Sequence, residues 1–375
     1  MKRIATVTYN RHANFTNYGS ALQTYALRQA IEAVGGGVVE AVCLDYCPRS
    51  HEGVDPLSPF RMMWDADGES RRMVELTMPA IRENLAKFER FYDEACGFTS
   101  RSYTSANVGE SWEDEGLSGY VCGSDTIFCI REFKGFDPGY YADVPQMAGR
   151  AVAYAASFGD VDWKPDELDM LSKKLTNFRA VGLREDAMVG FCRNHADVPV
   201  ERVTDPTLLL RQGDYLAIAA PRQHEAPYVL LYSRRYDPAM EAYAERLACE
   251  RGCDVVEISL RATNADLGHD MRYDAGVEEY LALVRDAEYV VTNSYHGLAF
   301  ALQMHTPFTV FTREQAGSKI SELLDWVGLC DRSASSADCD VWPEMRFEDV
   351  DARLEAIREH SLSFLRTELG LLGVL

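Results

Sequence analysis

Short runs of β-branched and aromatic residues alternate along this chain with longer segments in which apolar residues recur every three or four positions. Such runs predict buried strands, and the longer segments predict amphipathic helices. In the first half the predicted strands cover 4–9, 38–44, 120–122, 151–154 and 180–183, and the predicted helices cover 20–34, 71–96 and 166–177, with one more from 185. This alternation indicates a parallel sheet covered by helices.

A second series of the same kind follows a stretch that contains Pro206, Gly213 and Pro221. Its predicted strands cover 228–232, 254–258, 289–291 and 308–311, and its predicted helices cover 238–251, 276–286, 295–304 and 318–327. A charged amphipathic helix over 350–369 is expected to pack back on the first domain. The pattern therefore predicts an α/β chain of two Rossmann-like domains that face across a cleft. We expect an N-terminal domain over 1–210, a C-terminal domain over 211–345 and a C-terminal helical segment over 346–375.

The amino-acid composition limits the kinds of molecule that this protein is expected to bind. The 375 residues suit two domains of common size, and 47% hydrophobic residues are enough to form their cores. With 38 Lys and Arg against 59 Asp and Glu, the net charge of −21 argues against nucleic acid and membrane surfaces as partners. It does not exclude an anionic ligand, because salt screens surface charges beyond ~8 Å. The charge of the residues around the site therefore decides whether an anion binds.

Cysteines and apolar stretches point to a reducing compartment. The ten cysteines sit mostly in apolar contexts, and the C-x3-C pairs Cys43/Cys47 and Cys249/Cys253 lack the spacing of a zinc site. We interpret them as reduced thiols, with metal or redox roles as the less favoured alternative. No apolar stretch approaches the ~18 residues of a membrane span or resembles a secretory signal, so we expect a cytoplasmic protein.

Loops that directly follow predicted strands carry the candidate chemistry, because ligands of parallel α/β sheets bind beyond the carboxyl ends of the strands. Gly19, at the start of a helix after the first strand, lets backbone approach a ligand, while Asn17 or Ser20 serves as a simple helix cap in the alternative interpretation. Asp125 follows Ser124 after the strand at 120–122. It is a candidate base toward a sugar hydroxyl, with an Asx turn or a helix cap as the alternative.

Arg184 and His296 are the stronger candidates. Arg184 lies at the start of a helix, where a cation is unfavourable unless it binds an anion; a solvated arginine is the alternative. His296 follows the buried strand at 289–291 and precedes Gly297, a place that favours proton transfer over a structural histidine. Arg313 and Lys319 flank a Gly-containing loop after the last predicted strand. They are weaker candidates for the same anion.

In order along the chain, these segments resemble the polysaccharide pyruvyl transferase family. The matching stretches are 17–27, 123–125, 154–159, 184–185, 205–207 and 293–297. No single stretch is specific, but the ordered set is, and it extends over almost the whole chain. The resemblance implies a GT-B-like fold with the site between the domains. It also implies transfer of a pyruvyl group from phosphoenolpyruvate onto two hydroxyls of one sugar, giving a cyclic ketal on a cell-surface polysaccharide or its precursor, such as a lipid-linked oligosaccharide.

The resemblance also assigns roles to residues. His296 falls where the family has its histidine, which we interpret as proton donor or phosphate ligand, and Arg184 where it has its donor-binding arginine. Around these two we place Ser294, Gly297 and Lys319 on the donor side, Asp125 as base, and Asn17, Gly19 and Ser124 as residues that line the cleft. We expect no metal and no cofactor besides phosphoenolpyruvate as donor, and the resemblance allows a homo-oligomer.

Two departures from the family keep alternatives open. Ser294 stands where some members carry an arginine, and Gly317-Ser318-Lys319 stands where many carry Asn and Arg. A serine does not replace that charge, and a lysine lacks the bidentate fork. A nucleotide-sugar glycosyltransferase on the same architecture and a glycan-binding relative without turnover therefore remain as competing interpretations. The acceptor side is expected to come from the variable stretch 48–107.

Overall fold

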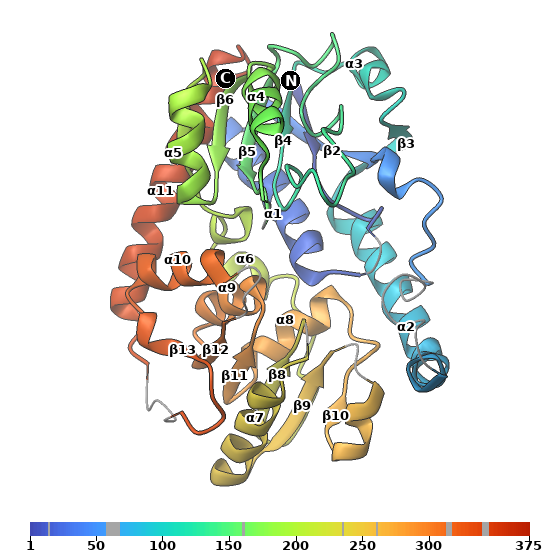
Figure 1. The fold of residues 1–375 in the computed structure, drawn as a ribbon, viewed down its shortest axis with the longest axis vertical. Coiled ribbons are helices and arrows are strands. Elements are labelled where there is room, and N and C mark those ends of the chain that lie inside the picture. Colours follow the sequence, from blue (N-terminus) through green and yellow to red (C-terminus); the bar gives the residue numbers. More distant parts are fainter. Residues whose placement is uncertain are drawn as a thin grey trace. The chain divides into compact units, whose positions relative to one another are not determined.

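The chain forms two compact units (Figure 1). The computed structural model describes residues 1–13, 16–57, 68–159, 162–234, 236–259, 262–312, 317–339 and 345–375, so Arg313 lies outside the described residues. Unit 1 comprises Met1–Val54, Arg90–Leu210 and Glu355–Leu375, and unit 2 comprises Asp55–Glu89 and Arg211–Leu354.

Unit 1 is built on a parallel sheet of seven strands in the order β3-β2-β1-β4-β5-β6-β7. The strands are β1 Lys2–Val7, β2 Val39–Cys47, β3 Phe98–Thr104, β4 Gly119–Cys122, β5 Ala151–Ala156, β6 Phe178–Leu183 and β7 Val200–Arg202. β1 pairs with β2 on one side and with β4 on the other. The strand order therefore reverses between β1 and β4, and a parallel sheet binds ligands at the carboxyl ends of its strands near such a point.

Alternate residues of these strands face opposite layers of core, as the two-residue period of a strand requires. In β1, Ile4 packs in the cluster that contains residues of helices α1 and α11, whereas Ala5 and Val7 pack in the cluster on the other face. That second cluster includes Leu171 from α4 and Val189 from α5. Both faces of the sheet are thus buried, which explains why its strands have continuous apolar sequences.

Unit 2 repeats the architecture with a parallel sheet of six strands in the order β10-β9-β8-β11-β12-β13. The strands are β8 Tyr228–Tyr232, β9 Asp254–Ile258, β10 Asp270–Met271, β11 Tyr289–Thr292, β12 Phe308–Phe311 and β13 Ser333–Ala334. The strand order reverses between β8 and β11, which pair from Tyr289 with Val229 to Thr292 with Tyr232. Each sheet therefore has its own reversal point.

The predicted helices lie close to their expected positions, and α3 and α6 are short helices that were not predicted. The α-helices are α1 Tyr18–Gly35, α2 Gly68–Ala95, α3 Ser111–Asp114, α4 Pro165–Leu175, α5 Asp186–His195, α6 Gln212–Leu216, α7 Pro238–Arg251, α8 Val277–Arg285, α9 Tyr295–Met304, α10 Gly317–Val327 and α11 Glu348–Leu371. The 3-10 helices are η1 Arg49–His51, η2 Val108–Glu110, η3 Pro206–Leu208, η4 Ala262–Leu267 and η5 Cys330–Arg332.

The predicted division of the chain needs two corrections. Residues 55–89, placed by the sequence in the N-terminal domain, belong to unit 2, because Asn84 donates to the carbonyl of Ala275 and Lys87 Nζ lies 2.8 Å from Glu279 Oε2. The C-terminal segment is also not separate. From Glu355 onward it belongs to unit 1, where Arg358 donates to the carbonyls of Leu208 and Leu210 at 3.0 and 3.2 Å. The prediction that this helix packs back on the first domain is confirmed.

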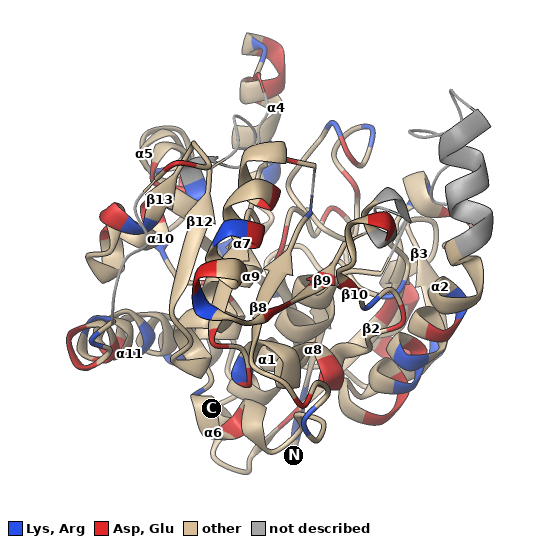
Figure 2. Cartoon of the chain, turned by 90° about the horizontal axis from the view of Figure 1, so that it is seen from below, with Lys and Arg blue, Asp and Glu red and all other residues tan. Residues whose placement is uncertain are grey.

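Charged residues of both signs share the helix surfaces. Acidic and basic positions lie along both α2 and α7 (Figure 2). Each helix has one ion pair between residues one turn apart, Lys87 with Glu83 at 3.3 Å and Arg246 with Glu250 at 3.0 Å. Within the described ranges, every helix is either too short or too polar to cross a bilayer.

Candidate functional site

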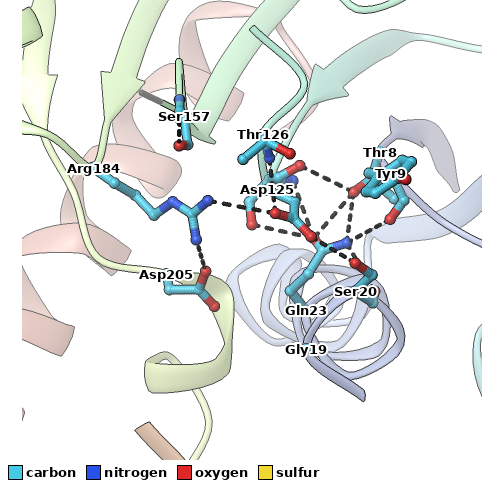
Figure 3. A network of polar contacts seen from close by, with 12 residues as sticks. Thr8, Tyr9, Gly19, Ser20, Gln23, Asp125, Thr126, Ser157, Arg184 and Asp205 are labelled. Atoms are coloured by element: carbon cyan, nitrogen blue, oxygen red, sulfur yellow. Dashed lines mark hydrogen bonds and ion pairs between the residues drawn. The ribbon is translucent and has the colours of Figure 1, made fainter. Parts of the chain in front are cut away.

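Gln23 of α1 connects the ends of two neighbouring strands of unit 1 (Figure 3). Its amide nitrogen donates to Thr8 Oγ1 at 2.8 Å and to the Tyr9 carbonyl at 2.9 Å, both just after β1. Its amide oxygen accepts from the backbone N–H of Ser124 at 3.1 Å, just after β4. Gln23 is fully buried, and it fixes the two loops that flank the reversal point.

The predicted residues around it have supporting roles in this structure. Asn17 accepts from the Gly19 N–H at 3.1 Å and so caps α1, the simpler of the two interpretations offered by the sequence. Gly19 is buried in the first turn of that helix. Ser124 is fully buried and donates to Gln23 Oε1 at 3.2 Å, so its side chain binds the protein's own amide instead of presenting a hydroxyl to a ligand.

Asp125 points into a network of donors at the carboxyl end of β4 (Figure 3). Its Oδ2 accepts from Ser20 Oγ at 2.6 Å and its Oδ1 from the Thr126 N–H at 2.8 Å. The preceding Gly123 has a φ of +146°, and a Cβ there would lie 1.9 Å from the Tyr154 carbonyl oxygen. Only glycine fits this turn, which holds the Asp125 carboxylate in place.

Arg184 lies between two carboxylates from different loops (Figure 3). It follows β6, donates to Asp205, and has its second amino group 3.7 Å from Asp125 Oδ1, which is beyond hydrogen-bond distance. Asp205 is fully buried and also accepts from the Thr207 N–H at 3.0 Å. The three charged groups, each under a tenth exposed, therefore carry a net charge of −1 when all are ionised, so an anion would have to take the place of the Asp125 contact.

In unit 2 the site residues gather where β11 passes into α9. Thr292 donates to the Tyr232 carbonyl at 2.7 Å and accepts from the Ser294 N–H at 3.1 Å, which fixes the first turn of the helix across the reversal point. His296 lies in that turn, 9% exposed, and its backbone carbonyl accepts from Tyr280 at 3.3 Å. Gly297 is buried one residue later, with no room for a side chain, because a Cβ would lie 2.3 Å from Thr292 Oγ1.

Lys319 lies in the first turn of α10, half-buried, at the carboxyl end of β12. β12 is the neighbour of β11, so Lys319 and His296 belong to the same edge of the unit 2 sheet. The structure thus brings Asp125 and Arg184 together at one edge in unit 1. It places Ser294, His296 and Gly297 together at the equivalent edge in unit 2.

Sequence reasoning missed two residues that organise the unit 1 edge. Gln23 and Asp205 were both within matched stretches but received no role. For Asp205 the sequence offers little signal, because β7, the strand that precedes it, is not predicted and its partner Arg184 comes from another loop. For Gln23 no local signal exists, since its partners outside α1 come from two separate segments, the loops after β1 and β4.

The described residues contain neither a candidate metal site nor a disulfide that could hold these sheet edges together. No group of three or more His, Cys, Asp and Glu side chains there is arranged to hold a metal ion. All ten cysteines are free thiols.

Comparison with known proteins assigns the family. The model of the polysaccharide pyruvyl transferases matches residues 17–315, which is most of the chain. The chain belongs to the polysaccharide pyruvyl transferase family. Its members are transferases by name, and the matched range contains Asp125 and Arg184 of unit 1 as well as His296 of unit 2. The resemblance predicted from the ordered motifs is confirmed. No curated protein matches the sequence.

Solved structures of other proteins match the chain at low sequence identity. A proposed UDP-N-acetylglucosamine 2-epimerase from Listeria monocytogenes is 11% identical, with a TM-score of 0.51 over 98% of this chain and 91% of that one. The UDP-GlcNAc 2-epimerase of Methanocaldococcus jannaschii is 10% identical, with a TM-score of 0.48 over 95% and 92%. An O-GlcNAc transferase mutant from Thermobaculum terrenum is 15% identical, with a TM-score of 0.44, and this chain spans 63% of its length. The first of these confirms the GT-B-like fold class of this family member.

Proposed function

We propose that this family member transfers the pyruvyl group of phosphoenolpyruvate onto two hydroxyls of one sugar, forming a cyclic ketal on a surface polysaccharide or its precursor. The family match over residues 17–315 carries this proposal. The positions of the matched residues support it. Asp125 and Arg184 follow strands β4 and β6 of one sheet, and His296 follows β11 of the other, so all three occupy carboxyl ends where α/β sheets bind ligands.

The reaction needs a proton for the methylene carbon of phosphoenolpyruvate, a base for the attacking hydroxyl and cations for a phosphate and a carboxylate. His296 is our candidate for the proton donor or phosphate ligand, because it lies in the first turn of α9, where backbone N–H groups favour an anion. Arg184 is our candidate for the donor carboxylate or phosphate, since its fork matches either group.

Asp125 is our candidate for the base toward the acceptor. It is an acceptor-only carboxylate whose neighbours hold it in one orientation, which is what proton transfer from a positioned hydroxyl requires. If a sugar hydroxyl replaces the Ser20 hydroxyl as donor to Oδ2, its proton moves to a carboxylate whose orientation the Thr126 N–H already holds. Ser294 and Lys319 are our further candidates for contacts to the donor.

Phosphate release tests the proposal directly. The protein is mixed with phosphoenolpyruvate and a panel of sugar acceptors, and free phosphate is followed with time. We expect His296→Ala to lower turnover by about a hundredfold or more if it acts as the acid. His305→Asn is the matched control, because His305 lies at the other end of α9 with a φ of +58°, a conformation that asparagine also adopts.

Unchanged turnover in His296→Ala would remove His296 from the mechanism and leave the reaction itself standing. A rise in melting temperature with a nucleoside diphosphate sugar but not with phosphoenolpyruvate would contradict the proposal and favour a glycosyltransferase on the same fold. Binding of phosphoenolpyruvate without product over long incubation with every acceptor would indicate a relative without turnover.

A further inference from the structure

Arg234 lies beside the turn into α9, at the carboxyl edge of the unit 2 sheet. β8 and β11 pair in parallel up to Tyr232 with Thr292. The same register, continued by two residues, brings Arg234 level with Ser294. The Arg234 N–H donates to Asn293 Oδ1 at 2.9 Å, so the two segments stay together beyond their last pair. Neighbouring strands lie about 4.8 Å apart, which is within the length of an arginine side chain.

Both sides of this loop are fixed to the sheet. The Ser233 N–H donates to the Ile258 carbonyl at 3.0 Å, which ties the loop to the end of β9. Asn293, which holds the other side, is fully buried. The place of Arg234 along the edge is therefore set by contacts with β9 on one side and with the turn from β11 into α9 on the other.

The first turn of α9 carries donors for an anion. The backbone N–H groups in the first turn of a helix have no partner inside the helix and favour an anion. Ser294, just before the helix, is only 5% exposed, yet its hydroxyl makes no hydrogen bond with any described residue. The first turn also contains no acidic residue that would repel an anion. A buried hydroxyl without a protein partner at such a turn points to a partner outside the chain.

The charge of the two segments has the sign that an anion needs. Residues 232–234 and 292–297 contain no Asp or Glu, and Arg234 is their one Lys or Arg. At the end of neighbouring β9, Glu257 is fully buried and lies 2.6 Å from His269 Nδ1, so this carboxylate already has a donor. The unit 1 edge differs, because Arg184 lies there between two carboxylates. An anion is therefore favoured at the unit 2 edge.

We propose that Arg234 and the Ser294 hydroxyl bind the phosphate group of the donor at the first turn of α9. This assignment rests on the pyruvyl transfer proposed above and places the phosphate of phosphoenolpyruvate on unit 2. An arginine fork matches two phosphate oxygens, and the helix N–H groups bind an anion as well. When the C–O bond to the phosphate breaks, the phosphate leaves with both electrons of that bond. A cation at this place stabilises the charge that develops.

Calorimetric titration with phosphoenolpyruvate, alone and in competition with inorganic phosphate, tests this assignment. Arg234→Ala and Arg234→Gln should each weaken phosphoenolpyruvate binding by about tenfold to a hundredfold, the range for a hydrogen bond to a charged group. Competition by inorganic phosphate should weaken to the same extent. Arg234→Lys keeps the charge without the fork and should weaken binding by roughly threefold to tenfold. Ser294→Ala removes a neutral donor and should weaken binding by about twofold to tenfold.

Arg222→Ala is the matched control. Arg222 is an exposed arginine of unit 2 that donates to the nearby His224 carbonyl at 2.7 Å. This variant should bind phosphoenolpyruvate like the native protein. Thermal unfolding without ligand checks that each variant is folded. If the neutral variants at Arg234 do not fold, Arg234→Lys decides, and native affinity in that variant would overturn the assignment.

The outcomes separate this assignment from the proposed function. If the native protein binds and turns over phosphoenolpyruvate and the Arg234 variants bind it equally well, only the role of Arg234 is overturned. Unchanged competition by inorganic phosphate in weakened variants would also overturn that role, because Arg234 would then not hold the phosphate. Binding without turnover would contradict the proposed function, while the variants would still decide on Arg234. No binding of phosphoenolpyruvate by the native protein would overturn both.

Discussion

The two reversal points of this protein are held by different kinds of interaction. At the carboxyl edge of unit 1, Gln23 joins the ends of β1 and β4 by neutral hydrogen bonds. Beside it, charged side chains from the loops after β4, β6 and β7 bind one another, with Arg184 between Asp125 and Asp205. At the β8/β11 edge of unit 2, Thr292 connects one strand to the next helix by neutral hydrogen bonds, and Gly297 packs against it. The first edge depends on charge balance and the second on close backbone packing, so each is sensitive to a different substitution.

The largest effect is expected where a buried charge loses its partner. Asp205→Ala leaves the buried Arg184 guanidinium without its direct carboxylate partner, and breaking such a pair costs about 3–5 kcal/mol of the free energy of unfolding. Asp205→Asn keeps an oxygen that accepts from the Thr207 N–H but removes the negative charge. Its cost therefore measures the loss of the charge alone. Urea unfolding followed by circular dichroism measures both.

Asp186→Ala is the control for this prediction. Asp186 pairs with Arg202 at 2.5 Å in the same unit, but its side chain is 55% exposed, so its loss should cost at most about 1 kcal/mol. Equal losses for Asp205→Ala and Asp186→Ala would show that charge burial does not hold the unit 1 edge.

A smaller effect is expected from overpacking the unit 2 edge. Gly297→Ala would place a Cβ 2.3 Å from Thr292 Oγ1, and forcing an atom into a packed site costs about 1–3 kcal/mol. The shift of Thr292 should also disturb the Ser294 N–H that it binds.

Gly190→Ala is the matched control, a helix glycine in α5 with no atom within 4 Å of an added Cβ. It should stabilise the protein by up to about 1 kcal/mol through helix propensity. Thermal unfolding of both variants gives the comparison. A Gly297→Ala protein as stable as the native one would mean that the α9 turn is not fixed by close packing.

The stability of unit 1 should also depend on pH through the pair of His12, in the loop after β1, and Asp45 of β2. His12 has an ordinary pKa of 6.5 that is raised to about 9 in the folded protein, so its contribution to stability is full below pH 6.5 and is lost as pH rises through 9. Burial raises the pKa of Asp45, but hydrogen bonds from His12 and Ser102 outweigh burial and lower it below 3.8. Its contribution is therefore present above that pH and lost in acid.

The melting temperature of Asp45→Asn measures this. The native protein should exceed the variant most near pH 5–6.5, and the difference should shrink toward pH 10. Asp351→Asn, which breaks the exposed His305 pair in unit 2, should show a small difference at every pH. If the difference in melting temperature between the native protein and Asp45→Asn did not change with pH, the His12–Asp45 pair would not be the source of a pH-dependent stability.

The sequence correctly predicted the helices and strands whose bounds follow from local apolar periodicity. The bounds of β8, α7, β9, α9 and β12 match those expected from apolar periodicity. Edge strands β3, β7, β10 and β13 were missed because each is short or carries polar residues that strand patterns do not favour. The placement of residues 55–89 was wrong because it depends on contacts made by Asn84 and Lys87 nearly two hundred residues away.

The candidate site divides in the same way. That Asp125, Arg184 and His296 follow strands was readable from sequence, because parallel sheets collect their strand ends at one edge. The pairing of Arg184 with Asp205 and of His12 with Asp45 was not readable. Each pair joins residues from two segments, and the distance between those segments depends on the order of the strands in the sheet. Strand order cannot be inferred from local sequence.

The smallest change in stability is expected at the N-caps of α1 and α9, the two helices that begin at these edges. Asn17 caps α1 by accepting from the Gly19 N–H at 3.1 Å, whereas Ser294 at the start of α9 makes no side-chain capping bond with any described residue. Asn17→Ala should therefore cost about 1 kcal/mol, and Ser294→Ala only a few tenths, roughly the scale of a surface change.

Asn17→Asp serves as the matched control, because aspartate caps about as well as asparagine and should restore native stability. Chemical denaturation resolves these differences if all three variants are measured together. If Ser294→Ala cost as much as Asn17→Ala, the Ser294 hydroxyl would be stabilising α9 after all. It would then be a poor candidate for contacting the donor, since a ligand would have to displace it. A negligible cost leaves that hydroxyl available, as the proposed donor contact requires.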